Sequence, residues 1–145
     1  MNFNVKYSTL EAEAEMQDRR RQPRKDLMSY SQVYDLSDGR LIGYLGDINL
    51  LGAMVISDHP LKENKVLSIS IELPELPAVH DTNLIISVRV AYCRQDISPD
   101  YYNVGIEFNA TTQKQQSIIQ AIMDNYEFRR QAPNYPLHPN EMDDL

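Results

Sequence analysis

The residues best suited to bind an anion lie in one short basic block near the N-terminus. Five of the fourteen basic residues fall within seven positions: Arg19, Arg20, Arg21, Arg24 and Lys25. The arginine guanidinium is planar, so it can meet a phosphate with two parallel hydrogen bonds and can also stack on a flat ring. Pro23 disfavours helix at Gln22, so we expect an extended block that can wrap a small ligand. The block predicts a site for a compact phosphorylated molecule, with a solvated linker as the alternative.

A second candidate motif, Asp-x-Asn-x-x-Gly, covers residues 47–52. In an extended segment Asp47 and Asn49 point to the same face and present two hydrogen-bonding side chains together. The Asp47 carboxylate can accept from two N–H donors on a guanine edge, and Asn49 offers both a donor and an acceptor. Gly52 permits a tight backbone path beside a ligand. Taken alone, the same pattern is also typical of a plain β-turn.

The charge of the remaining chain argues against long polyanions as partners. The 145 residues have a formal net charge of −7, and without residues 18–26 the chain retains 9 basic and 19 acidic residues. Such a body discourages nucleic acid and anionic membranes, whereas a single cluster can still capture a small anion. An OB-like barrel for single-stranded nucleic acid would need aromatic and basic residues interleaved along one face. We therefore expect neither nucleic-acid binding nor membrane insertion.

The elements that must position these motifs are mainly strands. Runs rich in Val, Ile and Tyr, separated by turn residues, predict six strands at residues 27–34, 41–48, 51–57, 66–73, 83–94 and 102–108. In the clearest strand the core-facing positions alternate regularly: Leu84, Ile86, Val88, Val90 and Tyr92. Six short strands at this spacing predict a mainly β domain, built as a closed or nearly closed antiparallel barrel.

A C-terminal amphipathic helix is predicted over residues 111–130, because apolar residues recur there at spacings of three and four. Thr111 or Thr112 can serve as its N-cap, and Arg129 and Arg130 would suit the negative end of the helix dipole. Residues 1–18 read as a flexible acidic arm or a short helix. Residues 131–145, with three prolines and an acidic finish, read as a mobile tail.

The remaining residue types favour a binding protein over an enzyme. Cys93 is the single cysteine and cannot form an intrachain disulfide, which points to the reducing cytoplasm. The N-terminus lacks a signal-peptide pattern, and no apolar run is long enough to span a membrane. The three histidines lie in unrelated contexts and predict no metal site. No catalytic constellation or phosphate-binding glycine loop stands out.

The two motifs in this setting resemble the PilZ domain family. Arg20-x-x-x-Arg24 precedes a six-stranded β domain, and Asp47-x-Asn49-x-x-Gly52 follows within it. The resemblance covers about residues 19–128, which places a PilZ domain at 19–130 with an arginine arm at 19–25 and a barrel at 27–109. It implies a bacterial cytoplasmic receptor for cyclic di-GMP, a second messenger with two guanines and two phosphates, acting in motility or biofilm regulation.

The resemblance also implies a role for each motif residue. Arg20 and Arg24 match the family's arginines that bind the phosphates and the Hoogsteen edge of guanine, the O6 and N7 acceptor pair. Asp47 matches the acidic position that faces a guanine, and Gly52 matches the closing glycine. Asn49 departs from the serine that is commonest at its position, which puts affinity in question more than binding.

The same resemblance also implies how many ligand molecules each chain binds and how the signal reaches a partner protein. Arg19 precedes the first motif arginine and Arg21 lies inside the motif; in the family, a basic residue at the preceding position goes with a stacked, intercalated ligand pair. We therefore expect two cyclic di-GMP molecules per chain and no other cofactor. Without a fused output domain, a monomer or weak dimer would signal to an unidentified downstream protein when the arm becomes ordered. The alternative is a PilZ-like protein-interaction module that does not bind nucleotide.

Overall fold

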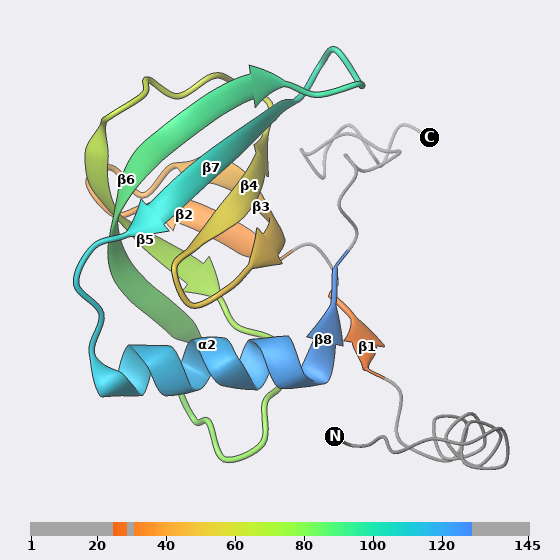
Figure 1. Cartoon of the computed structure of the whole chain (residues 1–145), viewed down its shortest axis with the longest axis vertical. Helices are drawn as coiled ribbons and strands as arrows, with labels where there is room; N and C mark the ends of the chain where they lie inside the picture. The colour runs from red at the N-terminus through yellow and green to blue at the C-terminus, as the bar shows by residue number, and fades with distance from the viewer. Residues whose placement is uncertain (1–24, 29–30, 129–145) are drawn as a thin grey trace, which may run out of the picture.

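The computed structural model describes residues 25–28 and 31–128, and its centre is a closed antiparallel barrel (Figure 1). The barrel contains six strands in the spatial order β2-β3-β4-β7-β6-β5: β2 Gln32–Asp35, β3 Leu41–Ile48, β4 Gly52–Ser57, β5 Val66–Glu72, β6 Asn83–Gln95 and β7 Tyr102–Phe108. Pairing of β2 with β5 closes the cylinder, which leaves none of the six strands as an unpaired edge. The predicted six-stranded β-barrel with a C-terminal helix is confirmed.

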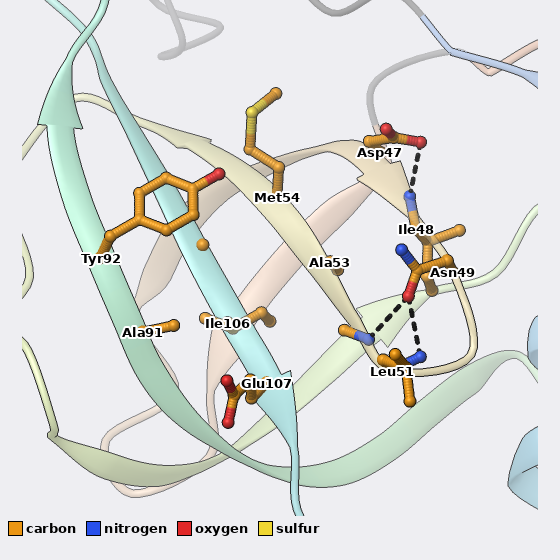
Figure 2. A pocket seen from close by; sticks show the side chains of 12 residues that line it. Asp47, Ile48, Asn49, Leu51, Ala53, Met54, Ala91, Tyr92, Ile106 and Glu107 are labelled. Carbon is orange, nitrogen blue, oxygen red and sulfur yellow. Dashed lines mark hydrogen bonds between the residues drawn. The ribbon is translucent and has the colours of Figure 1, made fainter.

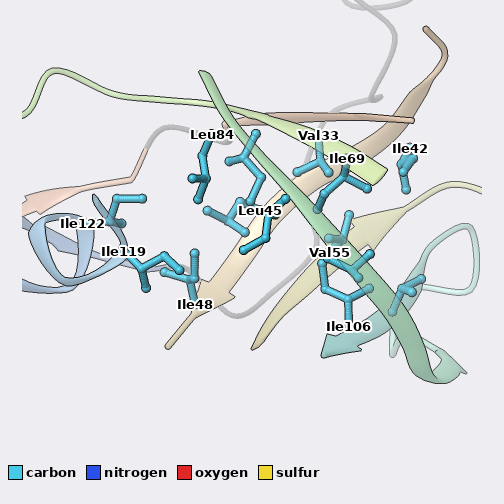
Figure 3. Packing of buried hydrophobic residues seen from close by; sticks show 14 of the residues in the cluster. Val33, Ile42, Leu45, Ile48, Val55, Ile69, Leu84, Ile106, Ile119 and Ile122 are labelled. Atoms are coloured by element: carbon cyan, nitrogen blue, oxygen red, sulfur yellow. The ribbon is translucent and has the colours of Figure 1, made fainter. Parts of the chain in front are cut away.

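Alternating apolar residues fill the barrel interior (Figure 3). Val33, Val88, Val90 and Val104 are fully buried, and isoleucines and leucines from β3, β5, β6 and β7 pack around them. Removal of this apolar surface from water is the main force that holds the strands together. The outward positions between these residues remain available for a binding surface.

Strand β6 departs from the predicted alternation after Val90. Val90 pairs with Ile106 but Tyr92 pairs with Gly105, so Ala91 is an extra residue in a β-bulge. The bulge shifts the alternation by one residue: Cys93 packs against the core, and Tyr92 covers Gly105 on the outer face. The prediction that Tyr92 shares the core face with Val90 is therefore wrong, because a period-two pattern does not detect an inserted residue.

Helix α2, Gln113–Asn125, lies across one end of the barrel (Figure 1). Its N-cap is Thr112, which is one of the two predicted candidates. The Thr112 hydroxyl accepts from Gln115 N at 3.1 Å, and the Gln115 side chain accepts from Thr112 N at 2.8 Å. Ile119 and Ile122 are fully buried and Ile118 nearly so, which seals this end of the core.

The helix ends five residues earlier than predicted because the chain enters a small second sheet. β8, Tyr126–Glu127, pairs in parallel with β1, Asp26–Leu27, and Met28 N donates to Glu127 O at 2.7 Å. These bonds favour extended backbone at Tyr126 over another helical turn. They also separate β1 from the barrel, so the predicted single strand over 27–34 is wrong. Arg129 and Arg130, like segments 1–18 and 131–145, lie outside the described residues.

The buried carboxylate of Asp35 stabilises the β2–β3 turn through hydrogen bonds to Ser37. Its Oδ1 accepts from Ser37 N at 2.9 Å and from Ser37 Oγ at 2.8 Å. Burial alone would raise the pKa of Asp35, but these hydrogen bonds and the charge of Lys65 together hold the pKa below its ordinary value. A lowered carboxyl pKa adds stability that is present above about pH 4 and is lost as the pH falls through the folded-state pKa.

We expect Asp35→Asn to remove this part of the pH dependence. The amide oxygen can still accept from Ser37, so the variant should fold, but it has no proton to gain in acid. Urea unfolding at several pH values between 7 and 3 should show a smaller loss of unfolding free energy in the variant than in the wild type. Equal losses in the two proteins would contradict this account of Asp35.

Candidate functional site

A groove of about 410 Å³ lies on the outer face of the barrel (Figure 2). It crosses β3, β4, β7 and β6, which are neighbours in the barrel. Figure 2 shows Asp47 and Asn49 on one side and Tyr92 and Glu107 on the other. The groove therefore collects polar and aromatic side chains from segments that are up to 60 positions apart in the sequence.

Asp47 reaches the outer face through a second β-bulge. Leu45 pairs with Val55 and Asp47 pairs with Met54, so Gly46 is the extra residue in β3. Ile48 then points into the core, while Asp47 lines the groove and accepts from Ile48 N at 2.9 Å. This placement agrees with the predicted outward carboxylate, although a bulge precedes it.

Asn49 both forms the β3–β4 turn and lines the groove. Its Oδ1 accepts from Leu51 N at 2.8 Å and from Gly52 N at 3.1 Å, and Asn49 N donates to Gly52 O at 2.8 Å. The turn interpretation is therefore correct, but it does not exclude a role in the groove. Because the turn uses the side-chain oxygen, the amide NH₂ is the group that Asn49 can offer to a ligand.

Gly52 lines the groove beside Asn49, but strand packing explains why a glycine is needed there. It pairs with Glu107 of β7, and a Cβ at Gly52 would overlap the carbonyl oxygen of Ile106. The residue must therefore lack a side chain for β4 and β7 to approach. Close approach to a ligand, the sequence-based reason for Gly52, is a second possible use of the same open surface.

Tyr92, Met54 and Glu107 are among the groove residues that were not recognised as site candidates from the sequence. Tyr92 was assigned to the core because its bulge was not detected, and Met54 and Glu107 belong to no motif. The outward position of Glu107 was detectable, since Val104, Ile106 and Phe108 alternate with it along β7. The Tyr92 ring occupies the space that a Cβ at Gly105 would need, and Arg94 Cζ lies 4.8 Å from the ring centroid.

Comparison with known proteins identifies the family. Residues 18–125 match the family model described as PilZ domain, which covers most of the chain and ends at the last residue of α2. The chain therefore belongs to the PilZ domain family. The matched range of the PilZ domain includes both the arginine block and the Asp47 motif.

Two solved structures share the PilZ fold with this chain. The structure of Bacillus subtilis inhibitor of motility (MotI/DgrA) has a TM-score of 0.52 at 17% identity; the match covers 71% of this chain and 51% of that one, about half its length. The PilZ domain of YcgR from Escherichia coli, solved with c-di-GMP, has a TM-score of 0.52 at 15% identity. This match covers 73% of this chain and 89% of that one. At these identities the likeness shows the fold alone. No match was found among curated proteins.

The predicted ligand-binding residues Arg19, Arg20, Arg21 and Arg24 lie outside the described residues, which begin at Lys25. Lys25 follows Arg24, and its Nζ donates to Met123 O at 3.1 Å. Met123 lines a second hollow of about 440 Å³, together with Asp47, Ile48, Tyr126, Glu127 and Phe128. Asp47 lines both hollows, and Lys25 contacts Met123 at the second of them.

Tyr126 lines this second hollow and is held in place by a hydrogen bond. Its hydroxyl donates to Glu75 O at 2.7 Å. Burial, followed by the charges of Asp26 and Glu75, raises the pKa of Tyr126 above its ordinary value, so the hydroxyl remains a donor at neutral pH. The bond ties β8, and with it β1, to the loop between β5 and β6.

Residues 25–28 and 31–128 contain neither a metal-binding cluster nor a membrane-spanning helix. No group of three or more His, Cys, Asp or Glu side chains is arranged to hold a metal ion. Over the same residues, no helix has the length and apolar character needed to cross a membrane.

Proposed function

We propose that this PilZ domain is a receptor for cyclic di-GMP, bound between the arginine segment and the outer groove of the barrel. The observation that carries the proposal is the position of Asp47 at the border of two hollows. One contains Asn49 and Tyr92, and the other contains Met123, to which Lys25 is hydrogen-bonded. A ligand over Asp47 would therefore be within the neighbourhood of both halves of the motif.

The chemistry of each group suits part of this ligand. Arg20 and Arg24 would bind the phosphates and the O6 and N7 acceptors of guanine. Asp47 would accept from guanine N–H donors, and the Asn49 amide would donate. Tyr92 adds a flat ring, and a base that replaced Arg94 over this ring would gain the roughly 1–3 kcal/mol that base–aromatic stacking contributes. This division of roles uses charge for the phosphates and directional contacts for the bases.

Two ligand molecules per chain are part of the proposal. Arg19 and Arg21 add two positive charges to the motif pair, and a stacked pair of dinucleotides has four phosphates to neutralise. Extra guanidinium groups would also cover the additional base surface by stacking. The rest of the chain is acidic, so we expect selection of this compact anion over long polyanions.

Titration with cyclic di-GMP by calorimetry tests the receptor and its stoichiometry together. We expect binding that saturates at two ligands per chain, with no measurable binding of a DNA duplex under the same salt conditions. Saturation at one ligand would reject the intercalated pair and retain the receptor. Absence of binding would reject the receptor and favour a PilZ-like protein-interaction module.

The proposed output is a binding event rather than catalysis. Ordering of the arginine segment by a ligand that it contacts directly supplies the differential interaction that a switch needs. In the cytoplasm, a separate protein would then recognise the ordered arm, with the receptor acting as a monomer or weak dimer. A pull-down with and without cyclic di-GMP should show partner proteins that differ between the two conditions.

A further inference from the structure

Glu107 occupies a position that the receptor motif does not explain. It lies on the outer face of β7, pairs with Gly52 on one side and Arg89 on the other, and lines the groove (Figure 2). A carboxylate in a groove proposed to hold an anion costs electrostatic energy. Donors on the ligand that contact the carboxylate would offset this cost.

Arg89 fixes the place of the Glu107 carboxylate. Arg89 Nη2 donates to Glu107 Oε1 at 2.8 Å, and Arg89 Nη1 donates to Asn64 Oδ1 at 2.8 Å. Arg89 is thus held between the loop after β4 and the strand that carries Glu107. Within residues 25–28 and 31–128 this ion pair uses only Oε1, and the side chain of Glu107 remains 59% exposed, so Oε2 is accessible to a ligand.

We propose that Glu107 selects guanine over adenine at the wall of the groove opposite Asn49. A carboxylate only accepts hydrogen bonds, and the Watson–Crick edge of guanine offers two adjacent donors, N1–H and the 2-amino group. Adenine has an acceptor at N1 and a single donor at N6, so its edge would place a lone pair against a carboxylate oxygen. Once a bound base covers Glu107, a carboxylate that faces a lone pair instead of two donors disfavours adenine strongly. The inference rests on the proposed receptor function and assigns a specificity residue to it.

The variant Glu107→Gln should shift the preference of the groove from guanine toward adenine. An amide of the same size presents one donor and one acceptor, which matches the Watson–Crick edge of adenine instead of guanine. The variant also removes a negative charge near the ligand, which changes the affinity for every cyclic dinucleotide. The ratio of dissociation constants for cyclic di-AMP and cyclic di-GMP cancels that common effect and isolates the recognition of the base.

The experiment measures this ratio in the full-length wild type, in Glu107→Gln and in the control Glu72→Gln. Glu72 is an exposed carboxylate on β5 that does not line the groove. We expect Glu107→Gln to lower the ratio at least tenfold and Glu72→Gln to leave it within twofold of the wild type. Since Glu107 is exposed, its ion pair adds little to stability, and both variants should fold.

The possible results separate this inference from the function on which it rests. Tight binding of cyclic di-GMP by the wild type with an unchanged ratio in Glu107→Gln would overturn the role of Glu107 alone. An equal fall of the ratio in Glu72→Gln would also overturn it, because the effect would then be one of net charge. No binding of cyclic di-GMP by the wild type would overturn the receptor and this inference together.

Discussion

Arg20→Ala and Arg24→Ala should each weaken cyclic di-GMP binding by about 1.5–3 kcal/mol, or roughly 10- to 150-fold. This is the usual contribution of hydrogen bonds made by a charged group, and each substitution removes one guanidinium. Calorimetry on the single variants and on the double variant would measure the two losses and their coupling. Because both side chains would hold the same ligand, we expect the double variant to deviate from simple addition.

Arg40→Ala is the matched control for these two variants. Arg40 is an exposed arginine in the β2–β3 turn, at the opposite end of β3 from Asp47, and its replacement changes the net charge by the same amount. If long-range attraction alone drew the ligand to the protein, the three variants would lose similar affinity. Raising the salt concentration would then abolish the difference between each variant and the wild type. Nearly unchanged affinity in Arg20→Ala and Arg24→Ala would reject the site assignment.

The course of most barrel strands could be predicted from alternation, but the outer surface could not. Leu84, Ile86 and Val88 alternate because one face of β6 is buried, which is a local signal of burial. The bulges at Gly46 and Ala91 are defined by the register with β4 and β7, in each case the next strand along the chain, and a period-two pattern does not detect the inserted residue. Those bulges set the direction of Asp47 and Tyr92, so the full groove required the tertiary structure.

The two motifs were found for different physical reasons. The arginine block is visible because charge is concentrated in an acidic chain, and no fold is needed to see it. The Asp47 motif is visible as a turn, and its Asn49 does form one. Glu107 carries no such local mark, since a single glutamate on a strand resembles any solvated residue. Glu107 becomes a candidate specificity residue only in the folded structure, where it lines the groove and is held by Arg89.

The end of α2 shows how a tertiary contact overrides helix periodicity. The apolar spacing continues through Tyr126, so the sequence favours a longer helix. Pairing of β8 with β1 satisfies the backbone of Tyr126 and Glu127 in an extended form instead. That pairing depends on a segment about 100 positions earlier, which no local window contains. It also brings the segment after the arginine block against the C-terminal end of α2.

Ile119→Ala should reduce the free energy of unfolding by about 2–5 kcal/mol, as expected for truncation of a fully buried isoleucine. Ile119 lies in the middle of α2 and contributes to the same core as Ile48 and Leu84 (Figure 3). The loss should appear as a lower midpoint in urea unfolding with one cooperative transition, because helix and barrel share that core.

Ile97→Ala supplies the control for the same chemical change at a solvated position. Ile97 is fully exposed in the β6–β7 turn, so its truncation should alter the unfolding free energy by no more than about 0.5 kcal/mol. Similar small effects at both positions would mean that α2 is not part of the folding unit. A large loss of unfolding free energy in Ile119→Ala alone would show that the helix is a structural part of the PilZ domain. The contact between Lys25 and Met123 would then link the arginine segment to a rigid body, so that a ligand held by the arm is held against the barrel.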